Sequence, residues 1–426
     1  MKKTISILAA LAASAAFASA PAATITNCGF ADGVLTLEYT LTDDAVVTFD
    51  VLCDGDSVGG AAVVGGVLAG SDVWKRVAAE NGATRTIRWR PDFWEGSADG
   101  FTAQVTAWAL DNPPDYMVAD ISTHAVAGSQ RYYPGADFVP GGVAGNPRYR
   151  QTALLMRKIM AKDVKWTMGA SDSMRYVTLT NNYYMGVFEV TQSQWAQVKG
   201  DYRTGYTGTF TNVLVREMRP VNNVSYCDVR VSTDNVWYKN WEFPAAPHQN
   251  SFLGIVRTRT GIDFDLPGEA QWEFAARAGH GAGEWNNGDA DAAANLNALG
   301  RYSDNGGTTS DYSCSTNHGT AVCGSYAQSD WGLYDMHGNL CEWCLDWFDE
   351  LGNIAAMSEP LDYRVNIHTD DRAYRFSSGK GTVKVKKGGS WSQWYGSSKP
   401  EWRGSDAPTT RYFNIGFRVM CPVEVP

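Results

Sequence analysis

Glycine and tryptophan are frequent in the larger, C-terminal part of this chain, from about residue 150 to residue 424. That part has few long periodic segments. Glycine permits backbone conformations that strain other residues, and tryptophan buries a large apolar area. We therefore expect a domain of short elements around an aromatic core. Two helices stand out: one follows the capping box Thr191–Gln194 and ends before Gly200, and one covers 269–278 and stops at Gly279.

Residues 24–121 follow a different pattern, in which apolar and polar residues alternate. A two-residue period indicates strands with one buried face. Several short strands separated by Asp-Gly turn signals predict an all-β immunoglobulin-like or fibronectin-like sandwich, which we interpret as a spacer or docking module. The predicted organisation is a sandwich over 21–125, a linker rich in proline and glycine over 126–149, and a second domain over 150–426.

The N-terminus has the features of a Sec signal peptide over 1–20. Met1–Lys3 is positively charged, residues 5–17 are apolar and rich in alanine, and Ala18–Ala20 fits an A-x-A cleavage site. We expect cleavage after Ala20, so that the mature protein is secreted, periplasmic or held at the cell surface. No later stretch approaches the length of a membrane span. The net charge of −10 argues against a nucleic-acid partner, because binding phosphates requires clustered Lys and Arg.

Eight cysteines in an exported chain are available for disulfides. Cys28 and Cys53 are isolated from the others in sequence and are natural partners for one another. The remaining six can pair in many ways, and the sequence does not choose among them. Cys341 and Cys344 have thioredoxin-like spacing, but no βαβ pattern surrounds them, so a structural role is favoured. The basic run Lys384–Lys387 predicts an edge strand with a solvated face.

Several motifs of the C-terminal part occur in the same order as in a known family. They are W-T-M-G at 166–169, Y-M-G-V-F-E-V-T-Q-S-Q-W at 184–195, R-P-V-N-N-V-S-Y at 219–226, L-P-G-E-A-Q-W-E-F-A-A-R-A-G at 266–279, G-L-Y-D-M-H-G-N-L-C-E-W at 332–343, and the K-G-G-S-W and N-I-G-F-R runs at 387–391 and 414–418. This part of the chain resembles the formylglycine-generating enzyme (sulfatase-modifying factor) family. The resemblance implies an α+β, C-type-lectin-like fold for the second domain, preceded by the all-β sandwich.

The enzyme of that family holds copper with two cysteines placed shortly after the G-G-S motif, and it uses O₂ to oxidise a substrate cysteine. Here the corresponding stretch is Ser392–Ser398, which contains no cysteine. Serine and glutamine cannot replace thiolates around a soft metal, so we expect neither copper nor formylglycine-generating oxidase activity. Another branch of the family uses iron and histidines, and the six histidines here lack metal-binding spacing.

The resemblance also implies a structural calcium ion. The family's calcium positions correspond to Asp335, Gly338, Leu340 and Glu342, where two carboxylates flank a glycine turn and the two middle residues offer backbone carbonyls. A hard cation takes six to eight oxygens from such mixtures. The alternative is a turn whose acids only cap backbone amides. A second family site maps in part to Asn295 and the carbonyl of Leu296, with its other ligands near Asp304, Asp311 or Ser315.

Aromatic residues among small polar ones fill the stretch from Trp391 to Phe413. Such a mixture is typical of a binding surface. We predict that the ligand-binding residues are Trp391, Gln393, Trp394, Tyr395, Trp402, Arg403, Tyr412 and Phe413. The layout resembles the variable proteins of diversity-generating retroelements, whose diversified segment lies between G-G-S-W and G-F-R. The alternative is an ordinary surface of a degenerate family member.

These observations favour an exported binding module whose partner is a protein or a carbohydrate. Two other functions stay open. One is a metal-dependent enzyme of the same family with unidentified chemistry. The other is carbohydrate binding through calcium, as in C-type lectins, although their sugar-contacting motifs are not evident in this sequence.

Overall fold

The computed structural model describes residues 20–91, 101–170, 174–203, 216–231, 245–306, 318–348, 363–365 and 383–423. The chain divides into two compact units. One contains residues up to Ala119 together with Ser129–Asn146, and the other contains Asp120–Gly128 and Pro147–Pro422. The expected signal peptide lies outside the described residues except for Ala20. Among the described helices, none has the length and apolar character needed to cross a membrane.

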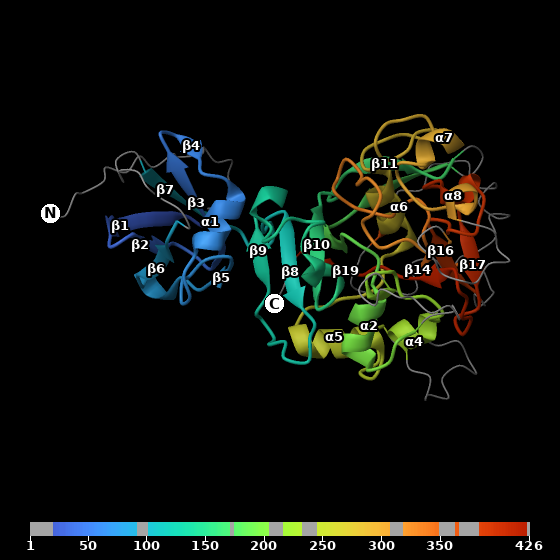
Figure 1. Cartoon of the computed structure of the whole chain (residues 1–426), viewed down its shortest axis with the longest axis horizontal. Helices are drawn as coiled ribbons and strands as arrows, with labels where there is room; N and C mark the ends of the chain where they lie inside the picture. Colours follow the sequence, from blue (N-terminus) through green and yellow to red (C-terminus); the bar gives the residue numbers. More distant parts are fainter. Residues whose placement is uncertain are drawn as a thin grey trace. The chain divides into compact units, whose positions relative to one another are not determined.

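The first unit is an all-β sandwich (Figure 1). One sheet has the order β1-β2-β6, from the antiparallel strands β1 (Ala23–Ala31), β2 (Val34–Leu41) and β6 (Arg85–Trp89). In the other sheet, β3 (Ala45–Cys53) pairs with β4 (Asp56–Ser57), β5 (Lys75–Val77) and β7 (Phe101–Trp108). The short helix α1 (Gly60–Gly66) lies between β4 and β5 in sequence.

The alternation along the first strands builds the core of this sandwich, as predicted. On β2 the buried residues are Leu35, Leu37, Tyr39 and Leu41, and on β3 they include Val47, Phe49 and Val51. The two sheets meet where Trp89 of β6 packs edge-on against Phe101 of β7, with ring centroids 6.3 Å apart. The period-two pattern therefore identified the strands and the buried face of β2, whereas on β3 the intervening Val46 and Thr48 are buried as well.

The expected disulfide between Cys28 and Cys53 is not formed, because both residues are thiols in the structure. Cys28 lies on β1 and Cys53 ends β3, and these strands belong to different sheets. Isolation in sequence does not establish the roughly 4–7 Å spacing of Cα atoms that a disulfide requires. Cys323, Cys341, Cys344 and Cys421 are also thiols.

Most of the segment expected to be a linker is packed into the first unit. Strand β9 (Arg131–Tyr133) pairs with β8 (Tyr116–Asp120), and the 3-10 helix η2 (Ala136–Phe138) follows. Phe138 and Tyr133 both pack on Trp74, with ring centroids 6.0 and 5.6 Å from it. These ring contacts give residues 129–146 a place in the core of that unit.

The described residues of the second unit contribute strands to three sheets. Strand β13 (Tyr183–Gly186) lies between β10 (Ala153–Ile159) and β19 (Met420–Pro422). A second sheet has the order β11 (Lys165–Met168), β12 (Arg175–Leu179), β15 (Tyr363–Val365). The third has the order β17 (Gly404–Asp406), β16 (Lys384–Lys387), β14 (Cys341–Trp347), β18 (Ile415–Gly416).

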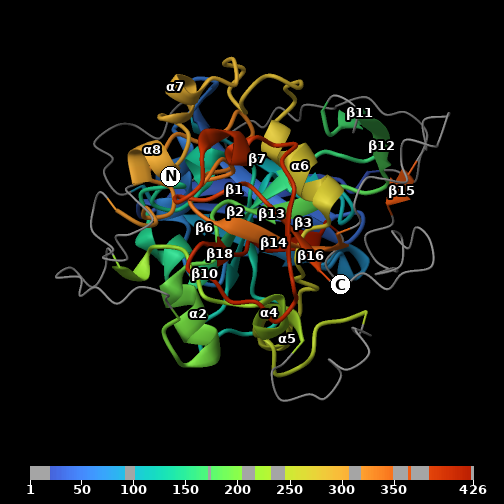
Figure 2. The same cartoon turned by 90° about the vertical axis from the view of Figure 1, so that its right-hand side faces the viewer.

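Short helices lie on two sides of the β14–β16 sheet (Figures 1 and 2). On one side are α2 (Gln192–Lys199), α4 (Tyr226–Arg230) and α5 (Phe252–Thr260). On the other are α6 (Glu269–Arg277), α7 (Ala293–Leu296) and α8 (Ser303–Gly306). The unit also contains the 3-10 helices η3 (Pro147–Arg150), which precedes β10, and η7 (Tyr395–Ser398), which follows β16.

Both predicted helices are confirmed. Thr191 Oγ1 accepts from Gln194 N (3.1 Å), Gln194 Oε1 accepts from Thr191 N (2.9 Å), and α2 ends at the left-handed Gly200. Helix α6 ends at Arg277, and its left-handed C-cap Ala278 is followed by Gly279, which has a φ of 90°. Capping signals are local in sequence, which is why they locate helix ends without knowledge of the tertiary fold.

The prediction of an edge strand at Lys384–Lys387 is wrong. Strand β16 is paired on both sides, with β14 and β17. Lys387 is fully buried, and its Nζ donates to Glu273 of α6 at 2.9 Å, while buried Lys384 donates to the main-chain oxygen of Leu345 at 2.6 Å. Lys386 pairs with Asp406 of β17. Each lysine therefore has an acceptor, which is what allows this basic run to lie inside the fold.

Candidate functional site

The turn that was expected to hold calcium is built on left-handed backbone. Asp335, Gly338 and Asn339 have φ values of 58°, 106° and 65°. A Cβ at Gly338 would lie 2.2 Å from the main-chain oxygen of Arg301, so glycine is required there. The turn carries the chain into β14, where Leu340 and Glu342 are buried. The sequence thus brings the four expected residues into one tight segment.

Glu342 does not present an available carboxylate. Its oxygens accept from Arg418 Nε (3.2 and 3.1 Å), Arg418 Nη2 (2.9 Å) and Trp272 Nε1 (2.7 Å). Glu342 and Arg418 are both fully buried, so this is an ion pair shielded from water. Arg418 also donates to the main-chain oxygens of Gly186 and Val187. A cation at Glu342 would have to replace these donors.

Asp335, by contrast, has an oxygen without a hydrogen-bond partner. Its Oδ2 accepts from Gly324 N at 2.7 Å, while Oδ1 is buried and has no donor among the residues that the structure describes. Asp335 is 2% exposed. An unsatisfied buried acceptor is costly, and a bound cation is one way to satisfy it. Of the two carboxylates in the expected calcium set, Asp335 therefore fits an ion and Glu342 does not.

Two residues that the sequence analysis did not select lie beside Asp335. Glu189, between β13 and α2, and Cys323 each offer one atom, and these atoms and a carboxylate oxygen of Asp335 lie within 4.8 Å of one another. Cys323 Sγ is 3.8 Å from Glu189 Oε2 and 3.8 Å from the main-chain oxygen of Glu189. In the sequence, Glu189 is an acidic residue inside the apolar run 187–190, and this is the signal that could identify it.

Burial shifts the titration of all three groups toward their neutral forms. Loss of solvation raises the pKa of Asp335 to about 6. Loss of solvation, then the charges of Asp335 and Glu342, raise the pKa of Glu189 well above its ordinary range. Burial and the Glu189 charge likewise raise the pKa of the Cys323 thiol. The surroundings therefore favour the protonated, uncharged forms of these three groups.

The second expected calcium set is less suited to an ion. The main-chain oxygen of Leu296 already accepts from Leu299 N (2.9 Å) and Gly300 N (3.1 Å). Asn295 Nδ2 donates to the main-chain oxygen of Ala290 at 2.8 Å. Of the further candidates for this site, Asp311 and Ser315 lie outside the described residues. Calcium at either set stays a prediction of the sequence.

The aromatic segment 391–413 divides into a buried end and exposed positions. Trp391 is fully buried and forms a small core with Leu340, against which Phe413 packs at 5.6 Å between ring centroids. A ligand cannot touch Trp391 in this arrangement, so its expected binding role is replaced by a structural one. The G-G-S turn before it needs glycine at Gly389, which has a φ of 68° and no space for a Cβ beside Ser397.

Trp394 and Tyr412 are the most exposed of the expected binding residues. Trp394 is 63% exposed and Tyr412 is 51% exposed. Trp394 packs edge-on against Tyr395 at 5.1 Å between ring centroids. Tyr395 in turn packs on a buried cluster formed by Trp285, Leu296, Leu299 and Tyr302. Tyr395 therefore acts as the support of an exposed tryptophan.

The remaining expected binding residues are held by the fold. Arg403 makes two hydrogen bonds to the Glu269 carboxylate, and its guanidinium lies 4.8 Å from the centre of the Phe348 ring. Gln393 Oε1 accepts from Ser390 Oγ at 3.0 Å. Trp402 is half-buried. These contacts fix the segment around Trp394 and Tyr412.

Asn339 connects the buried cluster to the aromatic segment. Its Nδ2 donates to Glu189 Oε2 at 2.6 Å, and its main-chain oxygen accepts from Trp391 N at 2.9 Å. His337 supports the same region, since its Nδ1 lies 2.9 Å from the main-chain oxygen of Ser398. Burial lowers the pKa of His337 to about 4, which keeps the ring neutral and structural.

Residues 144–422 match the family model described as the sulfatase-modifying factor enzyme 1-like domain. The chain belongs to this family. The second unit is thus the α+β sulfatase-modifying-factor domain that the motifs predict, and the first unit is the all-β sandwich expected before it.

Two relatives and one solved structure are similar to this chain. The chain is 30% identical to the chaperone protein LppX of Paenibacillus barcinonensis over 201 residues, which are 42% of this chain and 68% of that protein. It is 27% identical to the formylglycine-generating enzyme of Thermomonospora curvata over 203 residues, covering 46% of this chain and about half (52%) of the enzyme. Treponema denticola variable protein 1 aligns at 22% identity with a TM-score of 0.46, covering 64% of this chain and 96% of that chain.

The sulfatase-modifying-factor copper site does not fit the residues found here. The stretch after the G-G-S motif contacts one thiol from β14, that of Cys341, whose Sγ lies 3.1 Å from Gln393 Oε1. Burial raises the pKa of that thiol to about 12. A single protonated thiol beside an amide does not supply the paired thiolates that a soft metal needs. The expectation that the chain binds no copper stays a prediction.

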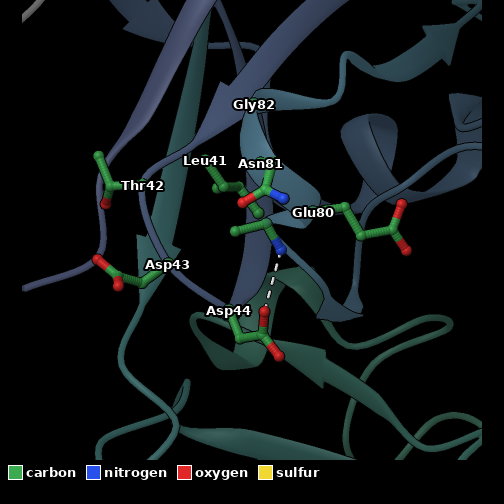
Figure 3. A pocket seen from close by; sticks show the side chains of 8 residues that line it. Leu41, Thr42, Asp43, Asp44, Glu80, Asn81 and Gly82 are labelled. Atoms are coloured by element: carbon green, nitrogen blue, oxygen red, sulfur yellow. Dashed lines mark hydrogen bonds between the residues drawn. The ribbon is translucent and has the colours of Figure 1, made fainter.

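The first unit of this sulfatase-modifying-factor protein has a hollow of about 550 Å³ with an acidic rim (Figure 3). Its lining includes Asp43, Asp44, Glu80 and Asn81. Ala79 N donates to Asp44 Oδ1 at 3.0 Å, and this hydrogen bond lowers the pKa of the Asp44 carboxyl. Because the carboxylates there are open to water and partnered in part, we assign no function to this hollow.

Proposed function

We propose that this protein is an exported ligand-binding protein, and that the ligand contacts the segment 391–413 of its sulfatase-modifying-factor domain. One observation carries the proposal: two large aromatic side chains, Trp394 and Tyr412, are more than half exposed on a segment whose ends are buried. Trp391 fixes one end and Ile415 of β18 fixes the other. Because both ends of the segment are fixed, its side chains are pre-organised, and less conformational entropy is lost on binding.

The chemistry of this surface favours a protein or carbohydrate ligand. Tryptophan and tyrosine offer rigid apolar area with a polar tip, and they are enriched where proteins bind partners. Ser392 and Thr409 of the same segment are not buried and can add hydrogen-bond donors and acceptors. Because the two rings already stand in water, a ligand that covers them gains their burial without unfolding any part of the domain.

The buried acidic cluster gives weaker support for an enzymatic function than the exposed aromatic residues give for binding. Glu189, Cys323 and Asp335 are each at most 2% exposed. A catalytic group has to come within hydrogen-bond reach of its substrate. In this conformation the cluster is closed to any substrate from outside, whereas the aromatic surface is open. We therefore favour binding over catalysis.

The binding proposal predicts the effect of removing both exposed rings. The purified chain would be screened on a printed glycan array and against a random-peptide phage library, and the best ligand would be titrated by isothermal calorimetry. Because aromatic anchors dominate interfaces, Trp394→Ala combined with Tyr412→Ala should weaken binding by roughly thirtyfold or more. Melting should change by only a few degrees, since neither ring is buried.

Tyr176→Ala provides the matched control, because Tyr176 on β12 is also a strongly exposed aromatic residue (46%) outside the segment. Its substitution should leave the affinity unchanged. Wild-type affinity in the double variant, at normal folding, would show that the ligand binds elsewhere.

A further inference from the structure

We propose that Glu189, Cys323 and Asp335 form a buried site for one thiophilic divalent cation of the zinc class. The three residues come from separate parts of the second unit: the link between β13 and α2, the segment before Gly324, and the turn before β14. Their donor atoms lie within 4.8 Å of one another. This site differs from the calcium set that the family resemblance implies, because it uses Glu189 and Cys323 in place of Glu342.

Among the described residues, the charges in this cluster are not balanced by a neighbouring cation. Glu342 has its own cation in Arg418, but neither Glu189 nor Asp335 is in an ion pair with a lysine or arginine in the described part of the chain. Arg150 is near, but its Nη1 donates to the main-chain oxygen of Cys323 at 2.9 Å. Ionised carboxylates are rarely left unpaired in a protein interior, because their desolvation is costly. A bound cation would balance them.

One carboxylate oxygen of the cluster is also unsatisfied within the described part of the chain. Asp335 Oδ1 is buried and has no hydrogen-bond donor among the described residues. The Glu189 oxygens are oriented by Leu340 N (3.0 Å) and Asn339 Nδ2 (2.6 Å). Hydrogen bonds of this kind, outside the ligand set itself, orient metal ligands in known sites. In this cluster the Glu189 carboxylate is oriented by two hydrogen bonds, whereas Asp335 has one oxygen that accepts no hydrogen bond from the described residues.

The Cys323 sulfur determines which class of metal fits the site. A thiolate suits zinc and its heavier analogue cadmium, whereas calcium takes six to eight oxygens and does not use sulfur. Tetrahedral zinc ligands at bond lengths of about 2.0–2.3 Å lie roughly 3.3–3.8 Å from one another. Cys323 Sγ is already 3.8 Å from Glu189 Oε2 and from the main-chain oxygen of the same residue. That main-chain oxygen supplies a fourth donor, and Cys323 loses its proton on binding.

The site is closed, so the ion enters as the chain folds. The test therefore uses full-length protein produced in medium supplemented with zinc, cadmium or calcium, with bound metal measured by mass spectrometry after dialysis. To remove two half-buried thiols of the first unit, all variants carry Cys28→Ser and Cys53→Ser. We expect one zinc or cadmium ion per chain, and for cadmium an ultraviolet thiolate-to-metal charge-transfer band.

Cys323→Ser and Asp335→Asn should each reduce metal occupancy at limiting zinc at least about tenfold, as loss of metal-site residues does elsewhere. Cys344→Ser is the matched control, because Cys344 is an equally buried thiol whose Sγ lies 3.9 Å from a main-chain oxygen, Glu342 O. That variant should keep the ion and the charge-transfer band.

Three results would overturn the proposal: no zinc or cadmium retained, a retained ion that persists in Cys323→Ser, or retention of calcium alone. The last would favour the oxygen-only set at the turn. If the Cys323→Ser chain does not fold, the charge-transfer band of the parent protein still decides, since its absence excludes a thiolate ligand.

Discussion

Replacing Arg418 with methionine should destabilise the second unit by about 3–5 kcal/mol, enough to unfold a marginally stable domain. The substitution removes the partner of Glu342 and leaves that carboxylate buried and unpaired. It also takes away the donors to the main-chain oxygens of Gly186, Val187 and Tyr334. Two more carboxylates, Glu189 and Asp335, lie close enough to add repulsion.

Urea unfolding followed by tryptophan fluorescence measures this loss, and hydrogen exchange of peptides from β14 assigns it to the second unit. Arg76→Met is the control with the same change of side chain at an exposed pair, since Arg76 and Asp44 are both more than two-fifths exposed. That control should cost less than about 1 kcal/mol. Adding Glu342→Gln to Arg418→Met should recover part of the loss. Equal stability of Arg418→Met and wild type would show that the pair does not hold the domain together.

The elements that the sequence predicted correctly are those specified by neighbouring residues. The capping box at Thr191 and the period-two pattern of β2 need only a few positions in a row. The solvated edge strand at Lys384–Lys387 failed because its environment is set by distant residues. Glu273, which accepts from Lys387, lies on α6, more than a hundred positions earlier in the chain. A run of basic residues cannot show which acids will meet it.

The same reasoning explains what was found and missed at the buried cluster. Asp335 was selected because it stands in a glycine turn of a recognised motif, and the structure leaves one of its oxygens unsatisfied. Glu342 belongs to the same motif, but its carboxylate is paired with Arg418, which lies 76 positions later in the sequence. Glu189 and Cys323 are 134 positions apart and carry no metal-ligand spacing. Their proximity is a property of the tertiary fold.

The second large effect is expected at Trp391, and Trp394 three positions later provides the comparison. Trp391 is fully buried and packs against Leu340 and Phe413, while Trp394 is largely exposed. Trp391→Ala leaves a large cavity in the core and should cost about 3–5 kcal/mol of unfolding free energy. Trp394→Ala removes a ring that stands in water and should change stability by less than about 0.5 kcal/mol.

Binding should respond in a different way from stability. Trp394→Ala should lower the affinity for the selected ligand while the domain stays folded, because that ring forms the contact surface. Trp391→Ala should lower binding only as far as it unfolds the domain, so its folded fraction, isolated at low temperature, should bind normally. Measuring unfolding and affinity on the same two preparations separates the roles. If Trp394→Ala proves as destabilising as Trp391→Ala, then Trp394 belongs to the core and the binding surface must be sought elsewhere.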